Sequence, residues 1–260
     1  MKKTLLLIAS AMLGMSAGAQ TVNVHRTDGT VVNYPASEVS YIDFSAKEEG
    51  VEGGTTPAGA AAVDLGLPSG TKWANMNVGA SKPEDYGLYF AWGETVGYGS
   101  DISDGRSFEW ASYKWSNGLY DTLTKYCTDS YFGTVDNKTV LDLEDDAAYV
   151  NWGSNWRMPT ITEIQELLDN TKHVWTTQNG VSGRKFTSKT NGNSIFLPAA
   201  GCRYGSYLLS QALYGYYWSS SLFESNPDDA RYLYFFSENA STGSSLERIY
   251  GFTVRPVLRN

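Results

Sequence analysis

Acidic side chains are abundant in this 260-residue chain and could do chemistry, with 28 Asp and Glu against 20 Lys and Arg. They gather at Asp142, Glu144, Asp145 and Asp146, following Asp136. Paired carboxylates separated by about 5 to 9 Å can hydrolyse glycosidic bonds. Surface charge and helix capping explain this group more simply, so we expect no glycosidase.

Histidine-dependent catalysis finds little support in the sequence. A Ser-His-Asp or Cys-His site needs an imidazole beside its nucleophile, and neither His25 nor His173 has a suitable partner near it in sequence. The sequence contains no glycine-rich phosphate loop, zinc-spaced cysteine set or dinucleotide fingerprint. We therefore expect a protein that is not an enzyme and that uses neither a metal nor a cofactor.

Cys127 and Cys202 are the two cysteines of the chain. An oxidising compartment would allow a disulfide, but a sequence does not give the distance between two thiols. Two separate buried thiols are the simpler interpretation. Both alternatives stay open at this point.

Two segments have the features of helices. Thr160 and Glu163 form a capping box, and Ile164, Leu167 and Leu168 follow at helical spacing, which predicts a helix ending near residue 170. A second helix is expected over residues 144–152, where acidic residues at the start favour the positive end of the helix dipole. The remaining chain is rich in Gly, Trp and Tyr, which favours short strands and long loops pinned by large aromatic side chains.

The first residues predict export. Lys2-Lys3, an apolar run to Met15 and Ala17-Gly18-Ala19 have the order of a secretory signal, so residues 1–19 are expected to be a cleaved signal peptide. An apolar run of about twelve residues is too short for a bilayer core of roughly 30 Å, so we expect no membrane insertion. The periplasm, the cell surface and the medium remain as alternative destinations.

Between the signal and the main domain we expect a small leader and a linker. Residues 20–44 alternate in a β pattern around Asp28-Gly29, which predicts a β-hairpin leader with a third short strand near residues 40–44. Residues 45–62 contain no aromatic residue and predict a flexible linker.

The net charge of −8 and the lack of a basic cluster argue against nucleic acid as a partner.

Three segments of residues 63–260 resemble a known family. They are residues 63–74, residues 155–160 together with Glu163, and residues 251–257. They resemble the Fibrobacter succinogenes major paralogous domain, a C-type-lectin-like domain of exported bacterial proteins, and the leader is similar to a hairpin of exported Bacteroidetes proteins. The resemblance implies an α+β fold with short strands, two helices and long loops.

Two related groups of the same fold suggest different chemistry. Formylglycine-generating enzymes rely on a cysteine pair in the C-terminal part of the domain, where this chain has Cys202 alone. Calcium-dependent lectins use a Pro-containing acidic loop, and Asn226-Pro227-Asp228-Asp229 looks similar, but the accompanying Trp-Asn-Asp motif is missing. Since calcium needs six to eight oxygen ligands, we expect a turn at this position.

The last sixty residues also resemble the retroelement-diversified region of some lectin-like proteins, in which a fixed frame alternates with adaptable positions. The frame would be Gly201, Arg203, Gly215, Tyr217, Trp218, Ser219, Ser220, Leu233, Phe235, Arg248, Gly251, Val254, Arg255, Pro256 and Val257. The adaptable positions would be Tyr204, Ser206, Tyr207, Ser210, Tyr214, Tyr216, Arg231, Tyr232, Tyr234, Ser237 and Asn239.

Tyrosine, serine and asparagine at the adaptable positions are typical of a recognition surface, because tyrosine gives a large contact area at small entropic cost. The resemblance therefore implies a non-catalytic binding or display protein whose partner is a protein or a glycan. Tyrosines that face the core or the outer side of strands are the plainer alternative. Two other functions stay open, a structural component of the cell envelope and an enzyme of the formylglycine-generating fold.

Overall fold

The computed structural model describes residues 21–25, 30–35, 54–101, 106–243 and 245–259. The chain separates into two compact units, Met1–Glu49 and Gly50–Asn260. In the first unit, β1 (Thr21–His25) pairs antiparallel with β2 (Val31–Pro35). The strands expected on either side of Asp28-Gly29 are therefore present. The expected signal peptide, the Asp28-Gly29 turn and the expected strand at residues 40–44 lie outside the described residues.

The regular structure of the second unit is mostly β-sheet. The described residues include two α-helices and the strand content is 35% overall, which is compatible with an α+β class. Its largest sheet has the order β14-β13-β12-β16-β5, and β15 also pairs with β13. The strands of this sheet are β5 (Tyr89–Phe90), β12 (Gly215–Leu222), β13 (Asp229–Phe235), β14 (Ala240–Ser241), β15 (Ser245–Glu247) and β16 (Phe252–Thr253).

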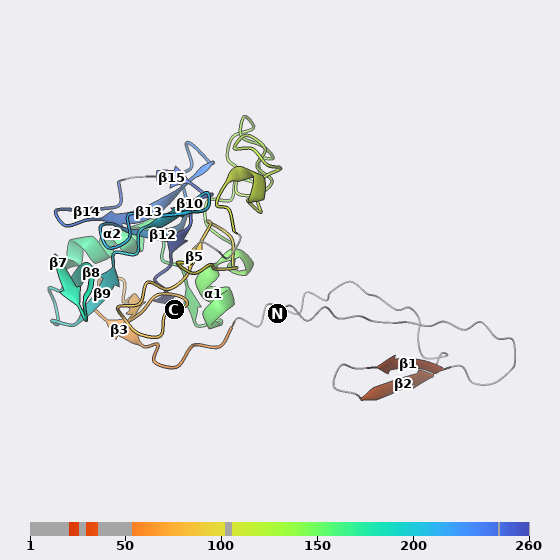
Figure 1. Cartoon of the computed structure of the whole chain (residues 1–260), viewed down its shortest axis with the longest axis horizontal. Coiled ribbons are helices and arrows are strands. Elements are labelled where there is room, and N and C mark those ends of the chain that lie inside the picture. Colours follow the sequence, from red (N-terminus) through yellow and green to blue (C-terminus); the bar gives the residue numbers. More distant parts are fainter. Residues whose placement is uncertain (1–20, 26–29, 36–53, 102–105, 244, 260) are drawn as a thin grey trace, which may run out of the picture. The chain divides into compact units, whose positions relative to one another are not determined.

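Three smaller sheets surround the largest one (Figure 1). One has the order β3-β4-β17-β6, a second has the order β7-β8-β9, and a third is the hairpin β10-β11. Their strands are β3 (Ala62–Asp64), β4 (Lys72–Ala74), β6 (Trp156–Arg157), β7 (Thr171–Gln178), β8 (Val181–Ser188), β9 (Ser194–Pro198), β10 (Cys202–Tyr204), β11 (Tyr207–Leu209) and β17 (Val257–Leu258).

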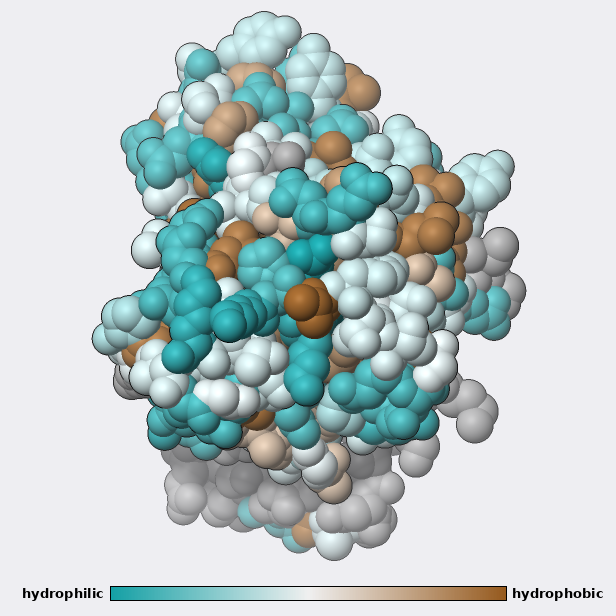
Figure 2. Space-filling view, turned by 90° about the vertical axis from the view of Figure 1, so that its left-hand side faces the viewer, coloured by the Kyte–Doolittle hydropathy of each residue, from teal (hydrophilic) through white to brown (hydrophobic). Residues whose placement is uncertain are grey.

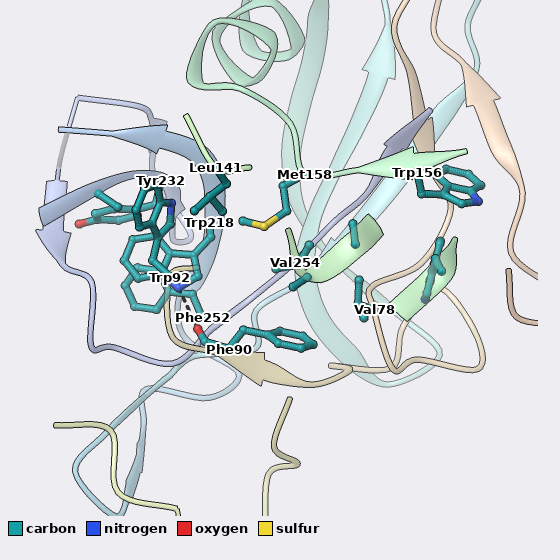
Figure 3. Packing of buried hydrophobic residues seen from close by; sticks show 14 of the residues in the cluster. Val78, Phe90, Trp92, Leu141, Trp156, Met158, Trp218, Tyr232, Phe252 and Val254 are labelled. Atoms are coloured by element: carbon teal, nitrogen blue, oxygen red, sulfur yellow. Dashed lines mark hydrogen bonds between the residues drawn. The ribbon is translucent and has the colours of Figure 1, made fainter. Parts of the chain in front are cut away.

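Two hydrophobic clusters lie on opposite faces of the β12–β13 pair. The register places Tyr217 opposite Leu233 and Trp218 opposite Tyr232, so residues of even and odd number point to opposite faces. The odd face packs against α2 (Ile161–Asn170) and the β7-β8-β9 sheet. On the even face, the rings of Trp92, Trp218, Tyr232 and Phe252 pack together, as Figure 3 shows.

The capping box that starts α2 is present as predicted. The hydroxyl of Thr160 accepts from the Glu163 N–H, and the Glu163 carboxylate accepts from the Thr160 N–H at 2.8 Å. Arg157 also donates to both carboxylate oxygens of Glu163, at 2.7 and 2.6 Å. The motif of residues 156–160 therefore fixes the entry into α2, which is a structural role.

The second expected helix begins later than predicted. Residues Leu143–Asp145 form one 3₁₀ turn, and α1 covers Ala147–Trp152. Asp146 is its N-cap, accepting from Ala148 and Tyr149. Asp146 therefore confirms the expected helix capping, although it is only 2% exposed. Asp145 is 1% exposed, so the explanation by surface charge is wrong for this residue.

The second half of the expected linker packs on the domain. Gly54 donates to Val150, and the hydroxyl of Thr56 donates to Trp152 and accepts from the Trp156 indole. Backbone and side-chain hydrogen bonds thus hold residues that composition alone suggested would be flexible. Residues from Gly54 onward therefore pack with this unit, although the expected boundary was at residue 63. No helix among the described residues combines the length and apolarity needed to cross a bilayer.

Candidate binding surface

One end of the even face of β12 and β13 is open to solvent. Trp218 and Tyr232, near its middle, are buried, whereas the neighbouring pair Tyr216 and Tyr234 is half-buried. Tyr216 and Tyr234 have ring centroids 5.2 Å apart, as expected for directly opposed residues of an antiparallel pair. An aromatic surface therefore begins where the even-face core ends.

Further rings extend this surface around Tyr234. Tyr214 stacks on Tyr234 with centroids 5.7 Å apart, and Phe236 lies 5.7 Å from Tyr234 and 5.9 Å from Tyr214. Tyr214 and Phe236 are both half-buried. The four rings form a connected group with one exposed side.

The β10–β11 hairpin adds exposed tyrosines. Tyr204 lies opposite Tyr207, so both side chains project from the same face of the hairpin, and they are 41% and 65% exposed. The ring of Tyr204 stacks on that of Tyr250, with centroids 4.5 Å apart. The ring of Phe252 contacts both Tyr250 and Tyr216, so the hairpin tyrosines are linked to the rings on β12. We call the resulting set the tyrosine face, and it consists of Tyr204, Tyr207, Tyr214, Tyr216, Tyr234, Phe236 and Tyr250.

Two glycines make this arrangement sterically possible. Gly201 has φ +68°, and a Cβ at this position would lie 2.2 Å from the Leu209 carbonyl oxygen. A Cβ at Gly215 would lie 2.1 Å from the ring of Phe235. Gly201 and Gly215 also pair with each other in a parallel bridge. Glycine is therefore required where the hairpin approaches β12.

The phenol groups distinguish the tyrosine face from the core. Core tyrosines donate their hydroxyls internally: Tyr89 to Ala200, Tyr113 to Trp92, Tyr126 to Asp145 and Tyr217 to Pro198. Within the described part of the chain, the phenol groups of the tyrosine face have no hydrogen-bond partner. Their hydroxyls are therefore available to a ligand.

Burial raises the pKa of three phenols of the tyrosine face. It raises the pKa of Tyr250 to about 12, and it also raises the pKa values of Tyr216 and Tyr234. Below the surface, burial raises the pKa of the Cys202 thiol to about 12. Tyr216, Tyr234 and Tyr250 therefore offer hydroxyl groups and ring surface, and no charge, across the physiological pH range.

The frame and adaptable positions separate clearly by burial. Every position assigned to the frame is buried, including Arg203, Arg248 and Arg255. The adaptable positions are exposed or half-buried with one exception, Tyr232. Tyr232 is 6% exposed because it packs against Trp218 and Phe252, so its assignment as a contact residue is corrected to the core.

The remaining candidates lie at different places. Ser206 is exposed in the β10–β11 turn, and Ser237 and Asn239 are exposed after β13, where Phe236 donates to the Asn239 carbonyl. Arg231 has odd number in β13 and points away from the tyrosine face, with its guanidinium 4.7 Å from the Phe223 ring centroid. Arg231 therefore does not contribute to the same surface.

Sequence reasoning missed Phe236 and Tyr250. The alternation of Tyr232 and Tyr234 along β13 would have placed Phe236 on the same face. Tyr250 joins the face through its stacking on Tyr204, a contact between residues far apart in sequence. No local pattern reveals that contact.

The acidic group does not form an open metal site. Carboxylate oxygens of Asp142, Glu144 and Asp145 lie within 4.8 Å of one another. However, the Lys125 ammonium lies 2.6 Å from both Asp142 and Asp145, and Lys114 lies 3.0 Å from Asp145. Two ammonium groups therefore already compensate these carboxylates, and Lys125 occupies the position between two of them.

The contacts of the other residues considered for chemistry are those of structural residues. His173 contacts the Arg184 guanidinium at 2.8 Å and packs on Phe186, and burial lowers its pKa. Cys127 and Cys202 are free and buried, as the second alternative for the cysteines expects. At residues 226–229, Asp229 donates to the Asn226 carbonyl at 2.9 Å, which confirms the predicted turn. The side chain of His25 lies outside the described residues.

No family model, curated protein or solved structure matches this chain.

Proposed function

We propose that the chain is an exported, non-catalytic binding protein with a C-type-lectin-like domain of the Fibrobacter succinogenes major paralogous type, whose adaptable positions are diversified by a retroelement. The tyrosine face recognises a protein or a glycan. The single observation that carries this proposal is the set of solvent-accessible phenol groups with no hydrogen-bond partner among the described residues, beside a fully buried frame.

The chemistry of the tyrosine face suits recognition. Each tyrosine presents a rigid aromatic surface together with one hydroxyl, and such residues are enriched at binding hot spots. Ring contacts restrain Tyr204, Tyr214, Tyr216 and Tyr234 in the free protein. Pre-ordered side chains lose less conformational entropy when a ligand binds.

The rim of the face supplies adaptable polar groups. Ser206 is exposed beside Tyr207, and Ser237 and Asn239 are exposed beside Phe236. Small polar side chains around aromatic anchors allow hydrogen bonds to partners of different shape. The arrangement and composition of these rim residues thus agree with the resemblance to retroelement-diversified lectin-like proteins, from which they were selected.

An assembly role is the second candidate, favoured by exposed leucines. Leu209 and Leu213 are 40% and 62% exposed, and Leu209 projects from the same side of the hairpin as Tyr204 and Tyr207. Large apolar patches mark association surfaces. The face that Figure 2 shows is mostly teal and white, hydrophilic or intermediate, and its apolar residues lie in small groups. Sedimentation velocity separates the two roles, because assembly through this hairpin predicts self-association that Leu209→Asp abolishes.

No observation on the described residues favours catalysis of the formylglycine-generating type. Burial raises the pKa of both thiols, so neither is held as a reactive thiolate. The two thiols are also not joined to each other. The binding function therefore accounts for more of the described structure.

The test compares two tyrosine pairs of equal exposure. Tyr204→Ala/Tyr207→Ala removes rings that are 41% and 65% exposed, and Tyr120→Ala/Tyr131→Ala removes rings outside the face with the same exposures. The purified chain and both variants are used to capture bacterial and host surface proteins and to probe a glycan array. Thermal unfolding confirms that each variant is folded.

Loss of a specific signal in the Tyr204/Tyr207 variant alone is the expected result. Equal signals from all three proteins would exclude this part of the tyrosine face as the site. Loss in the Tyr120/Tyr131 variant alone would move the site to the loop that projects from the body of the domain.

A further inference from the structure

A second surface of the domain is hollowed, on the side of β13 to which Arg231 points. The cavity has a volume of about 420 Å³. This volume lies at the lower end of the usual range for ligand sites, roughly 300 to 1,000 Å³, and suits a single small ligand. The polar groups that line it include Thr139, Thr162, Ser221, Ser225, Glu224 and Arg231.

Hydrogen bonds connect the cavity-lining residues at the end of β12 to two other lining segments. Val140 forms a β-bridge with Ser221, and Leu222 donates to the Thr139 carbonyl at 2.8 Å. The hydroxyl of Ser221 accepts from the Ile161 N–H at 3.1 Å, which ties the start of α2 to the end of β12. Three segments distant in sequence are therefore fixed around one opening.

The remaining wall is a loop that is also fixed. Phe223 donates to the Asp229 carbonyl at 3.2 Å, and Asn226 donates to the Phe223 carbonyl at 3.0 Å. The hydroxyl of Thr128 donates to the Glu224 carbonyl at 2.6 Å. The cavity therefore keeps its shape without a ligand, which lowers the entropic cost of binding.

Arg231 is the unusual group in this wall. Its guanidinium stacks on Phe223, which restrains its plane, and it is half-buried. Among the described residues, no carboxylate forms a salt bridge with it and no group accepts a hydrogen bond from it. In a chain of net charge −8, an oriented guanidinium without an acidic partner is a ready site for an anion.

The other lining groups narrow the chemistry of that anion. Four lining residues, Thr139, Thr162, Ser221 and Ser225, carry a hydroxyl, a group that can exchange hydrogen bonds with a ligand that carries hydroxyls of its own. The exposed carboxylate of Glu224 lines the same opening and disfavours a dianion such as phosphate, since like charges repel. Apolar atoms of Val140 and Ile161 can cover the C–H side of a ring.

We propose that this cavity binds a sugar carboxylate, the chemistry of a uronic acid residue in a glycan. Arg231 donates two N–H groups to the carboxylate, and the four hydroxyls of the wall bind the hydroxyls of the sugar. The site is separate from the tyrosine face, because Arg231 lies on the opposite face of β13 from Tyr234. It therefore does not rest on the proposed function.

The experiment titrates the purified chain with glucuronate and follows amide shifts by NMR. Glucose tests the need for the carboxylate, and acetate tests the need for the hydroxyls. Arg231→Gln removes the guanidinium. Arg259→Gln is the control, because Arg259 is an exposed arginine that also lies near an aromatic ring, 6.0 Å from the Tyr149 centroid, and it does not line the cavity.

Saturable binding of glucuronate, with shifts at Thr162 and Ser225, is expected for the wild type and for Arg259→Gln. Arg231→Gln should weaken it at least about tenfold, since charge-assisted hydrogen bonds are lost. Should Arg231→Gln prove unfolded, Arg231→Lys keeps the charge without the two-pronged donor and should bind more weakly than the wild type. No binding of glucuronate, equal binding of glucose or acetate, or equal binding by a folded Arg231→Gln would overturn the proposal.

Discussion

The two faces of the β12–β13 pair contain similar residues and have different surroundings. Tyr217 and Phe235 stack on the odd face, where α2 and the β7-β8-β9 sheet cover them. Tyr216 and Tyr234 pack on the even face and remain half-exposed. Neighbours in sequence thus differ in role because a second layer covers one face completely and the other in part.

Hydrogen bonding follows the same division. The hydroxyl of Tyr217 donates to Pro198 at 2.7 Å and accepts from the Asn77 amide at 3.2 Å. In the described part of the chain, the hydroxyls of Tyr216 and Tyr234 have no such partner. A buried polar group must be satisfied within the protein, whereas a group at the surface can be satisfied by water or by a ligand. The satisfied face is structural, and the unsatisfied face is the one that can bind.

Truncation of one tyrosine on each face is the strongest test of this comparison. Tyr217→Ala removes a buried ring and should lower the free energy of unfolding by roughly 3 to 5 kcal/mol. Tyr216→Ala should cost about half of that or less, because its ring is already partly in solvent. Urea denaturation of both variants measures the difference, and equal losses would mean that both faces are equally covered.

Alkaline pH should destabilise the protein through the buried phenols. Burial raises the pKa of Tyr217 to about 12, against about 10 in the unfolded chain. The unfolded state therefore releases its proton first, and stability is lost as pH rises from about 10 to about 12. For Tyr217 alone this amounts to about 2 to 3 kcal/mol, at about 1.4 kcal/mol for each pH unit.

Tyr217→Phe has no proton to release, so its stability should decline less over that pH interval than that of the wild type. Denaturation curves recorded at several pH values show this directly. Parallel declines of the two proteins would show that Tyr217 is not a source of the alkaline sensitivity.

Removing single hydroxyls should give a smaller contrast. Tyr217→Phe at neutral pH removes the hydrogen bond to the Pro198 carbonyl and the one from the Asn77 amide, and should cost about 1 to 2 kcal/mol. Tyr234→Phe breaks no hydrogen bond within the described structure and should leave the free energy of unfolding nearly unchanged. A marked loss in Tyr234→Phe would point to an internal partner for this phenol and remove it from the proposed binding site.

Local patterns in the sequence predicted the elements that depend on local contacts. The capping box of Thr160 and Glu163 joins residues three apart, and α2 begins where it predicts. The two hairpin strands around Asp28-Gly29 also follow from short-range alternation. By contrast, the start of α1 was misplaced, because Asp145 is held by Lys114 and Lys125, residues that lie far from it in sequence.

The sequence predicted which residue types form the candidate site, but it did not predict which of these side chains are exposed. The tyrosines between residues 204 and 234 were identified, yet whether each ring is exposed depends on what the rest of the chain lays over it. Trp218 and Phe252 cover Tyr232, and the strand alternation sends Arg231 to the other face. The cavity at Arg231 is formed by four separate segments and has no continuous sequence signal.

Tyr207→Ala should have the smallest effect on stability and still affect binding. The ring of Tyr207 is 65% exposed, so its removal should change the free energy of unfolding by less than about 0.5 kcal/mol. If the tyrosine face recognises a ligand, the same change should weaken capture of that ligand, since aromatic anchors dominate binding energy. Tyr131→Ala, with equal exposure, should change neither quantity. Unchanged capture by Tyr207→Ala would confine the contact region to the half-buried rings around Tyr234, where stability and recognition depend on the same side chains.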